Sequence, residues 1–357
     1  MRDVVALVTV GGEHLGSVGF TVDSPWWNDV EPVVTRLDAM LGVPTSVLRL
    51  ISATGSGMRG GTVTYLVEAA SRPSSWGSKA LEGNEPIVGS EQFAKSDPLR
   101  MPWAEPGGPA DLVAWAGARL EGVGRQVRKA VQVKTWNLSC LYRLETEGGT
   151  FWAKEIPAFM ADESAVISMV RSVDPGLVPD VVASAPQRVL MRAASGVDCW
   201  QPSAEVIADI VPRWVAVQAA LGARAEVRGR GLRKRNVHVP SFGLPDTVLH
   251  GDFHPGNWRS GGVVLDWGDA HWGHPALDAA RLIGFVGDDL GIAEVWADAW
   301  LRHRPDSDPQ AALKCARPAS HLVGALVYQE FLDRIEESER VYHLGDPERE
   351  LRTALSF

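Results

Sequence analysis

The chain has 357 residues, about 2.4 times the ~150 residues typical of one domain, so we expect two or three compact units. With 45% hydrophobic and 22% charged residues, its composition is that of a globular protein and excludes a disordered or fibrous chain. The 35 Lys and Arg against 44 Asp and Glu give a formal charge of −9, which disfavours a long basic surface, so we expect no nucleic-acid partner.

Cysteine usage and hydropathy indicate the compartment. Cys140, Cys199 and Cys315 are far apart and form no C-x-x-C pair, which argues against a disulfide framework and against a structural zinc cluster. The first residues lack the pattern of a signal peptide, and no stretch approaches the ~18 apolar residues of a membrane span. We therefore expect a cytoplasmic protein that does not contact a membrane.

Residues 1–108 predict a small α/β domain followed by a linker. The β-type runs within 2–22 are separated by glycines and predict a hairpin. Apolar residues at helical spacing over 28–41 predict a helix that ends at Gly42, and strands are expected at 46–51 and 62–69. From 71 to 108 Ser, Pro and Gly accumulate without periodicity, which is typical of a connection between domains.

From residue 109 onward the pattern predicts a β-rich lobe at 109–196 and a helical lobe at 197–357. The β-rich lobe begins with a helix over 111–131. Its later elements are two strands, a helix and a further strand, at 137–146, 150–158, 162–170 and 188–193. The helices expected in the second lobe are 204–221, 276–286, 293–302 and 321–342. The fold class is therefore α+β, with a short hinge between the two lobes.

One compact stretch in the helical lobe carries the chemistry. Residues 250–257 read H-G-D-F-H-P-G-N, and an apolar strand then leads to Asp266. This spacing matches the kinase catalytic loop H-R-D-x-x-x-x-N with its downstream metal-binding Asp. Phosphoryl transfer needs a carboxylate to orient the attacking hydroxyl and hard oxygen ligands for Mg²⁺. The motif therefore predicts a phosphotransferase.

HGDFHPGN, followed by LDW and by GHPALDAARL at 273–282, resembles the signature of the aminoglycoside phosphotransferase and choline kinase family. The resemblance covers roughly 109–357 and implies a two-lobed protein-kinase-like fold that uses Mg²⁺ and a nucleoside triphosphate, ATP or GTP. By position it makes Asp252 the catalytic base and Asn257 and Asp266 the magnesium ligands. His250 becomes a structural member of the loop, and Asp278 a scaffold acid.

The upstream strands carry the expected nucleotide contacts. Lys154 lies on a predicted strand and Glu163 on the helix that follows, where a kinase places the phosphate-binding lysine and the glutamate that orients it. The chain has no G-x-G-x-x-G in this region, and the resemblance suggests that the turn from Asn137 to Ser139 covers the phosphates instead. The hinge is expected near Met191 to Ala193, whose backbone would bind the base.

Several of these features also have simpler explanations. His250 and His254 have the spacing of a helical zinc pair, but Gly251 and Pro255 oppose a helix there. Trp258 and Trp267 are expected to pack under the loop rather than to bind substrate, although 14 tryptophans leave aromatic binding platforms open.

Two charged stretches flank the motif. The basic run 224–238 is expected to be a solvated loop, with contact to nucleotide phosphates or an acidic acceptor as the alternative. The acidic run 331–340 is expected to be an exposed helix face, with attraction of a cationic acceptor as the alternative.

The N-terminal domain resembles a Nudix fold in its element order and in a helix that ends in Leu-Gly-Val. A working Nudix box needs metal-binding glutamates, and alignment on Gly42 places Arg36, Ala39 and Met40 where acids belong. The resemblance therefore implies a non-catalytic domain that packs on the kinase, shapes its acceptor pocket or forms a homodimer interface. A Nudix hydrolase is disfavoured.

The sequence thus predicts a small-molecule kinase that phosphorylates a hydroxyl of a small acceptor. The family resemblance implies an antibiotic of aminoglycoside or nucleoside type, as in resistance, ahead of a metabolic sugar or amino alcohol. A catalytically silent binding module with this fold is the alternative from another class. A protein kinase is disfavoured because HGD replaces HRD and no DFG or APE element is present.

Overall fold

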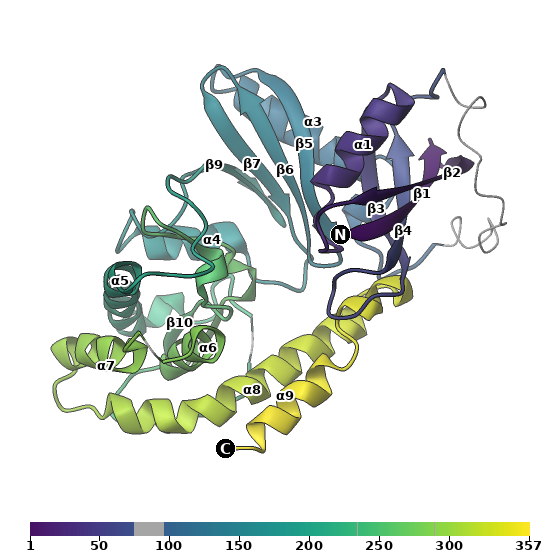
Figure 1. Ribbon diagram of the computed structural model, residues 1–357. Helices are drawn as coiled ribbons and strands as arrows, with labels where there is room; N and C mark the ends of the chain where they lie inside the picture. Colours follow the sequence, from purple (N-terminus) through teal and green to yellow (C-terminus); the bar gives the residue numbers. More distant parts are fainter. Residues whose placement is uncertain (75–95, 234, 289) are drawn as a thin grey trace. The chain divides into compact units, whose positions relative to one another are not determined.

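The computed structural model describes residues 1–74, 96–233, 235–288 and 290–357, and it confirms the α+β class (Figure 1). The chain forms two compact units. The first comprises Met1–Pro157 and Glu330–Leu344, and the second Ala158–Gln329 and Gly345–Phe357. The domain boundaries expected near residues 108 and 196 remain predictions. Most of the predicted linker, residues 75–95, lies outside the described part of the chain.

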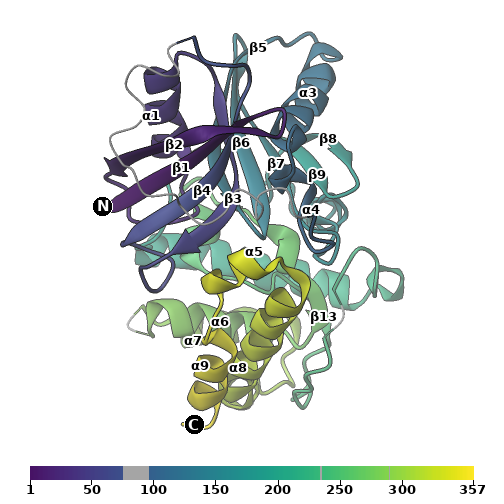
Figure 2. The same ribbon diagram turned by 90° about the vertical axis from the view of Figure 1, so that its right-hand side faces the viewer.

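The first unit begins with a four-stranded sheet in the order β2-β1-β4-β3 (Figure 2). Strand β1 is antiparallel to β2 and parallel to β4, and β3 is antiparallel to β4. One helix, α1, follows the hairpin. The bounds are β1 Arg2–Val10, β2 Glu13–Val22, α1 Glu31–Leu41, β3 Thr45–Ala53 and β4 Thr62–Ala69. The predicted hairpin, helix and two strands are confirmed.

Helix α1 forms where the apolar spacing places it. It buries Val33, Val34, Leu37 and Leu41, which recur every three or four residues and therefore share one face. Gly42 ends the helix in the left-handed conformation, φ +70°, and donates its N–H to the carbonyl of Asp38. The helix thus closes the hydrophobic core of this sheet.

The first unit continues with a short turn, a helix and three antiparallel strands: η1 Pro102–Ala104, α3 Gly108–Glu121, β5 Val127–Trp136, β6 Ser139–Thr146 and β7 Gly149–Glu155. The helix predicted over 111–131 is wrong beyond Glu121. Gly122 caps it and Gly124 adopts φ +71°, a conformation that a helix interior does not allow, so the chain leaves the helix and continues as β5.

The segment Glu330–Leu344 belongs to the first unit, although the 172 residues from Ala158 to Gln329 separate it from Pro157. It contains the turn η5, Glu337–Tyr342, whose Tyr342 packs edge-on against Trp27 and Trp136. The ring centroids lie 5.9 Å and 5.6 Å apart, within the range of favourable aromatic pairs.

Two acidic residues of this segment, Glu336 and Glu339, are buried, so the prediction of an exposed helix face is wrong for them, whereas Asp333 and Glu337 are exposed. Glu336 is 6% exposed and Glu339 is 3% exposed. Glu336 forms an ion pair with Arg100 at 3.0 Å, and Glu339 accepts a hydrogen bond from the backbone N–H of Leu50 at 2.9 Å. The carboxyl groups of Glu336 and Glu339 therefore serve contacts inside the first unit.

The second unit is mainly helical, and its core is built around α5, α6 and α7 (Figure 1). Two small antiparallel pairs, β10 with β13 and β11 with β12, frame the motif at 250–266. The helices are α4 Glu163–Arg171, α5 Ala204–Gly222, α6 Ala276–Val286, α7 Ile292–His303, α8 Pro309–Arg334 and α9 Asp346–Ala354, and α8 runs into the first unit. The strands are β8 Val181–Ala185, β9 Arg188–Arg192, β10 Thr247–Leu249, β11 Trp258–Arg259, β12 Val263–Val264 and β13 His271–Gly273, and the short turns are η2 Ala225–Val227, η3 Pro255–Asn257 and η4 Trp267–Asp269.

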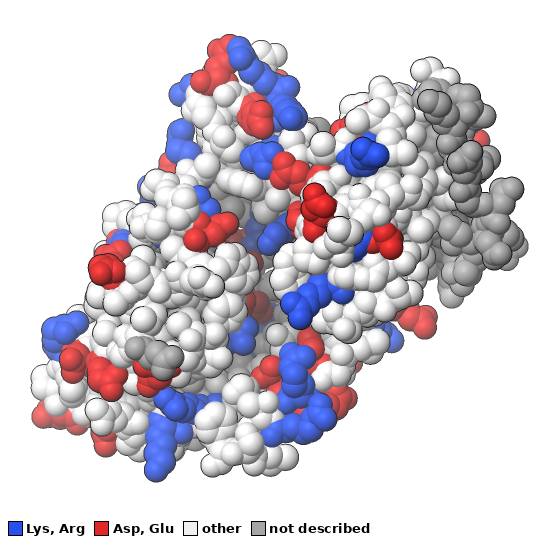
Figure 3. All heavy atoms as spheres, in the orientation of Figure 1, with Lys and Arg blue, Asp and Glu red and all other residues white. Residues whose placement is uncertain are grey.

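Charges of both signs lie on the face of the molecule that Figure 3 draws. On the face shown in Figure 3, Lys and Arg side chains are interspersed with Asp and Glu. Among the described residues, no helix is both long enough and apolar enough to cross a bilayer.

Candidate active site

The loop at 250–257 folds back onto the strand that carries Asp266. Strand β10 enters the loop, and the short hairpin β11–β12 returns the chain to Leu265. The backbone N–H of Leu265 donates to the carbonyl of Asn257 at 2.7 Å, and Nε2 of His250 donates to the carbonyl of Leu265 at 2.9 Å. These two bonds fix Asn257 and Asp266 on neighbouring stretches of backbone.

Gly251 is required by the geometry of this loop. Its φ is +86°, and a Cβ at this position would lie 2.2 Å from the carbonyl oxygen of Asp269. No side chain fits such a gap, so only glycine lets the backbone pass here. Steric hindrance therefore explains why glycine occupies the middle position of H-G-D.

The carboxylate of Asp252 is held from two sides. Arg281 on α6 donates to Oδ1 from Nε at 3.0 Å and from Nη2 at 2.8 Å, and His254 Nε2 donates to Oδ2 at 3.2 Å. Burial raises the pKa of Asp252, but Arg281 and His254 together lower it more, and the resulting pKa lies well below its usual range. The side chain keeps 31% of its surface exposed, so the ionised carboxylate remains accessible.

Asn257 and Asp266 offer oxygen atoms that suit a hard divalent cation. Asn257 uses Nδ2 to donate to the carbonyl of Asp252 at 3.0 Å, and among the described residues its Oδ1 accepts no hydrogen bond. Asp266 is exposed and adopts φ +64°, a left-handed conformation that is uncommon outside glycine. An amide oxygen and a carboxylate are ligands that Mg²⁺ accepts, so this donor set fits the ion that the resemblance implies.

Asp278 fixes the start of the loop through hydrogen bonds to its backbone. Its Oδ2 accepts from the backbone N–H of His250 at 2.9 Å and from Trp214 Nε1 at 2.9 Å, and its Oδ1 accepts from the backbone N–H of Gly251 at 3.1 Å. The side chain is buried, and desolvation raises its pKa. Its contacts are with the backbone of the loop and with α5.

Glu163 and Lys154 lie in different units. Glu163 is the first residue of α4, whose N-cap Asp162 accepts from the backbone N–H of Ala165. Its Oε1 accepts from the backbone N–H of Trp267 at 3.1 Å, so it anchors the residue that follows Asp266. Lys154 lies on β7 of the first unit and is 7% exposed.

The turn at Asn137 has internal partners. Nδ2 of Asn137 lies 3.0 Å from Nε2 of His343, and Oγ of Ser139 accepts from Trp136 Nε1 at 3.0 Å. Asn137 is buried. Both side chains are thus engaged within the first unit.

The predicted hinge residues lie at the end of β9. Met191 is buried and pairs with Val181 of β8, and Ala193 follows the last residue of the strand. The backbone N–H between them, that of Arg192, donates to the carbonyl of Asp180 at 2.9 Å.

Sequence reasoning missed an aromatic cluster beside Asp252. His254 stacks on Phe285 with ring centroids 4.3 Å apart, and Trp200 lies 6.1 Å from each of these rings. Trp200 is 58% exposed and Phe285 is 40% exposed, which is unusual for such large apolar side chains. Neither lies in a motif, so no sequence signal connects them with the loop.

Part of the basic run 224–238 is not solvated, which corrects the prediction for Arg233. Arg233 is buried, and its guanidinium forms an ion pair with Asp269. Lys234 lies outside the described residues. Trp258 and Trp267 are fully buried, as expected of packing under the loop.

The motif region matches a known family. Residues 194–312 match the sequence model of the phosphotransferase enzyme family, abbreviated APH. The match spans the loop, Asp266 and Asp278, and over these residues it confirms the family resemblance inferred from HGDFHPGN. No curated protein sequence matches the chain.

Solved structures also resemble the chain. A choline/ethanolamine kinase family protein from Mesorhizobium loti is 13% identical, with a TM-score of 0.48, and the alignment covers 70% of this chain and 98% of that one. A macrolide 2'-phosphotransferase from Brachybacterium faecium is 15% identical, with a TM-score of 0.47 and coverage of 67% and 97%. Choline kinase from Streptococcus pneumoniae is 13% identical, with a TM-score of 0.46 and coverage of 69% and 100%. These identities are too low to infer the substrate of this chain from those proteins.

Proposed function

We propose that the protein is a small-molecule kinase that transfers the γ-phosphoryl group of ATP or GTP to a hydroxyl of a small acceptor. The observation that carries the proposal is the loop at 250–257, where an ionised Asp252 and an Asn257 amide oxygen that accepts no hydrogen bond from the described residues lie in a segment that matches a phosphotransferase family. Asp252 is the residue proposed to contact the acceptor hydroxyl.

Asp252 is suited to orient the attacking hydroxyl. Because Arg281 and His254 keep its pKa low, the carboxylate is ionised at neutral pH and accepts a hydrogen bond from the acceptor. A carboxylate of low pKa is a weak base, so its main contribution is positioning and electrostatic, as expected for phosphoryl transfer.

Magnesium would be held by Oδ1 of Asn257 and the carboxylate of Asp266. Bound there, the ion neutralises charge on the triphosphate. Glu163 supports this role, because its bond to the N–H of Trp267 fixes the backbone beside Asp266. Lys154 is proposed to bind the nucleotide phosphates. The side chain of Asn137 is not proposed to contact the nucleotide, because its amide nitrogen is hydrogen-bonded to Nε2 of His343.

The acceptor is proposed to present a ring or apolar face next to its hydroxyl. Trp200 and Phe285 expose aromatic surface around His254, which itself bonds Asp252. Aromatic faces bind sugar rings, apolar groups and cations. The family resemblance favours an antibiotic over a metabolic sugar or amino alcohol, and this cluster suits a ring-bearing member of either group.

Nucleotide consumption tests the proposal, with ATP and GTP assayed against a panel of aminoglycosides, nucleoside antibiotics, sugars and amino alcohols. Asp252→Ala is expected to lose nearly all turnover while it keeps nucleotide affinity, and Asp266→Ala is expected to weaken magnesium-dependent nucleotide binding. Asp298→Ala, at an exposed position on α7, is the matched control and is expected to leave both unchanged. Normal turnover in Asp252→Ala would refute the assignment.

The aromatic cluster has a separate test. Trp200→Ala is expected to raise KM for a ring-bearing acceptor by about tenfold, because it removes a stacking face worth about 1 kcal/mol or more, while KM for the nucleotide stays the same. An unchanged acceptor KM would remove the cluster from the acceptor site but would leave the kinase assignment intact.

A further inference from the structure

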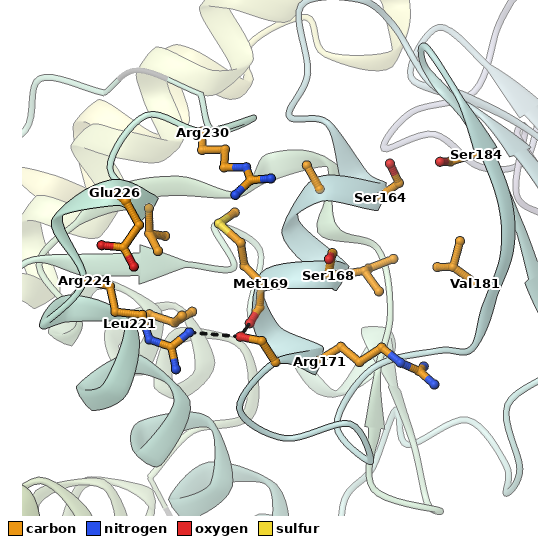
Figure 4. Close-up of a pocket in the computed structure, with 14 residues that line it drawn as sticks. Ser164, Ser168, Met169, Arg171, Val181, Ser184, Leu221, Arg224, Glu226 and Arg230 are labelled. Atoms are coloured by element: carbon orange, nitrogen blue, oxygen red, sulfur yellow. Dashed lines mark hydrogen bonds between the residues drawn. The ribbon is translucent and has the colours of Figure 1, made fainter.

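The second unit contains a cavity that the proposed kinase site does not use. It has a volume of about 610 Å³ and lies between α4, β8 and the stretch from the end of α5 to Arg230 (Figure 4). None of its lining residues belongs to the loop 250–257 or to the Asp266 turn. Its volume falls within the ~300–1,000 Å³ typical of small-molecule sites.

Three arginines from separate places line the cavity. Arg171 comes from α4, and Arg224 and Arg230 come from the turn region after α5. Among the lining residues, Glu226 is the single acid, so the three arginines leave a net positive lining. Such a combination is typical of a site for an anion, since guanidinium groups bind phosphate through several N–H donors at once.

The arginines differ in how far they are already engaged. Nη1 of Arg224 donates to Oγ of Ser172 at 3.1 Å, which fixes its direction. Nη2 of Arg171 lies 3.3 Å from Oδ1 of Asp180. Arg230 has no ion pair within the described part of the chain, and its guanidinium points into the space beside Met169 (Figure 4). Arg230 is exposed, so its guanidinium is accessible to an external anion.

The other lining groups define the kind of molecule that fits. Ser168 and Ser184 are exposed, and within the described part of the chain neither hydroxyl has a hydrogen-bond partner. Met169, Val181 and Leu221 provide apolar wall. Inorganic phosphate would make no apolar contact with these side chains, so the lining suits a phosphate group attached to an organic group.

The shape of the cavity is supported by backbone contacts. The N–H of Asp162, at the start of α4, donates to the carbonyl of Gly231 at 2.8 Å. Gly231 adopts φ +68°, and a Cβ there would lie 3.0 Å from Ala165. The basic stretch is thus tied to α4, and this contact holds Arg230, the residue before Gly231, at the cavity.

We propose that this cavity binds a small organic phosphate monoester, with Arg224 and Arg230 contacting the phosphate and the apolar wall contacting the organic part. The site is separate from the proposed nucleotide and acceptor sites. The basic run 224–238 has no role in the proposed kinase activity, and this proposal assigns it to ligand binding.

Calorimetric titration with phenyl phosphate and with inorganic phosphate tests the proposal, in a low-salt buffer that contains no phosphate. We expect the wild-type protein to bind phenyl phosphate more tightly than inorganic phosphate. Arg230→Ala and Arg224→Ala should each weaken phenyl phosphate binding by about three- to tenfold, the usual effect of one partly exposed charge-assisted contact. Glu226→Gln should tighten it by about two- to fivefold, because the acid repels the phosphate.

Two controls separate this site from others. Arg302→Ala removes an exposed arginine of α7 outside the cavity and should leave binding unchanged. Lys154→Ala should also leave it unchanged. Binding that Lys154→Ala removes and Arg230→Ala does not would place the probe at the nucleotide site and overturn the proposal, and so would the absence of phenyl phosphate binding. Neither result bears on whether the protein is a kinase.

Discussion

Glu339 should make the stability of the first unit depend on pH. Its carboxyl is buried and accepts a hydrogen bond from the backbone N–H of Leu50. Desolvation raises its pKa from 4.5 to about 8, despite the opposing influence of the Leu50 bond and Arg49. Folded protein therefore holds a proton at neutral pH that unfolded chain releases.

The sign and size of the effect follow from these two values. Because the folded state binds the extra proton, stability is full below pH 4.5 and falls as pH rises towards 8. Relative to low pH, where Glu339 is protonated in both states, this group lowers the free energy of unfolding by about 3 kcal/mol at pH 7 and by about 1 kcal/mol at pH 5. Its contribution between these two pH values is about 2 kcal/mol.

Glu339→Gln isolates this contribution. The amide keeps an acceptor oxygen for Leu50 and has no proton to lose, so its profile should be flatter than that of the wild type by about 2 kcal/mol between pH 5 and 7. Urea titrations followed by circular dichroism measure the free energy of unfolding at each pH. Glu337→Gln, at an exposed position two residues away, is the control and should follow the wild type. Parallel profiles for wild type and Glu339→Gln would refute the reasoning.

Three further predictions concern the loop. Gly251→Ala should displace the backbone near Asp269 and cost more than about 2 kcal/mol of stability together with turnover; a thermal melt equal to the wild type would contradict the steric argument. Asp278→Asn should cost about 2–3 kcal/mol, measured by urea unfolding, because an amide cannot accept on both sides; a loss under 0.5 kcal/mol would be inconsistent with its buried bonds. Arg281→Gln should raise the pKa of Asp252, so turnover should begin to fall at a higher pH on acidification than in the wild type, and a kcat profile identical to that of the wild type would contradict this role of Arg281.

The placement of the loop residues was predictable because it is local. His250, Asp252 and Asn257 lie within eight residues, and a single short hairpin brings Asp266 back to them. Helix α1 was equally local, since its apolar spacing and Gly42 mark both its face and its end. Asp278 was placed by its motif, but the bonds that it makes to the loop backbone are visible only in the fold.

The contacts that sequence reasoning missed are long-range. Glu339 meets Leu50 across 289 positions, and nothing in the acidic run indicates that two of its carboxylates become buried. Arg233 is likewise predicted to lie in a solvated basic loop, but it is buried and forms an ion pair with Asp269. Trp200 and Phe285 are adjacent only after α6 and the loop have packed. Charge and hydropathy patterns do not encode such pairings, because they depend on which surfaces meet.

The most direct test of the central claim is product analysis with Mg²⁺, γ-labelled ATP or GTP and the acceptor panel, using wild type and Asp252→Ala in parallel. We expect wild-type protein to move the label to a hydroxyl of at least one acceptor, and we expect Asp252→Ala to bind the nucleotide without moving the label. Label transfer by Asp252→Ala at the wild-type rate would contradict the account, as would failure of the wild-type protein to label any acceptor.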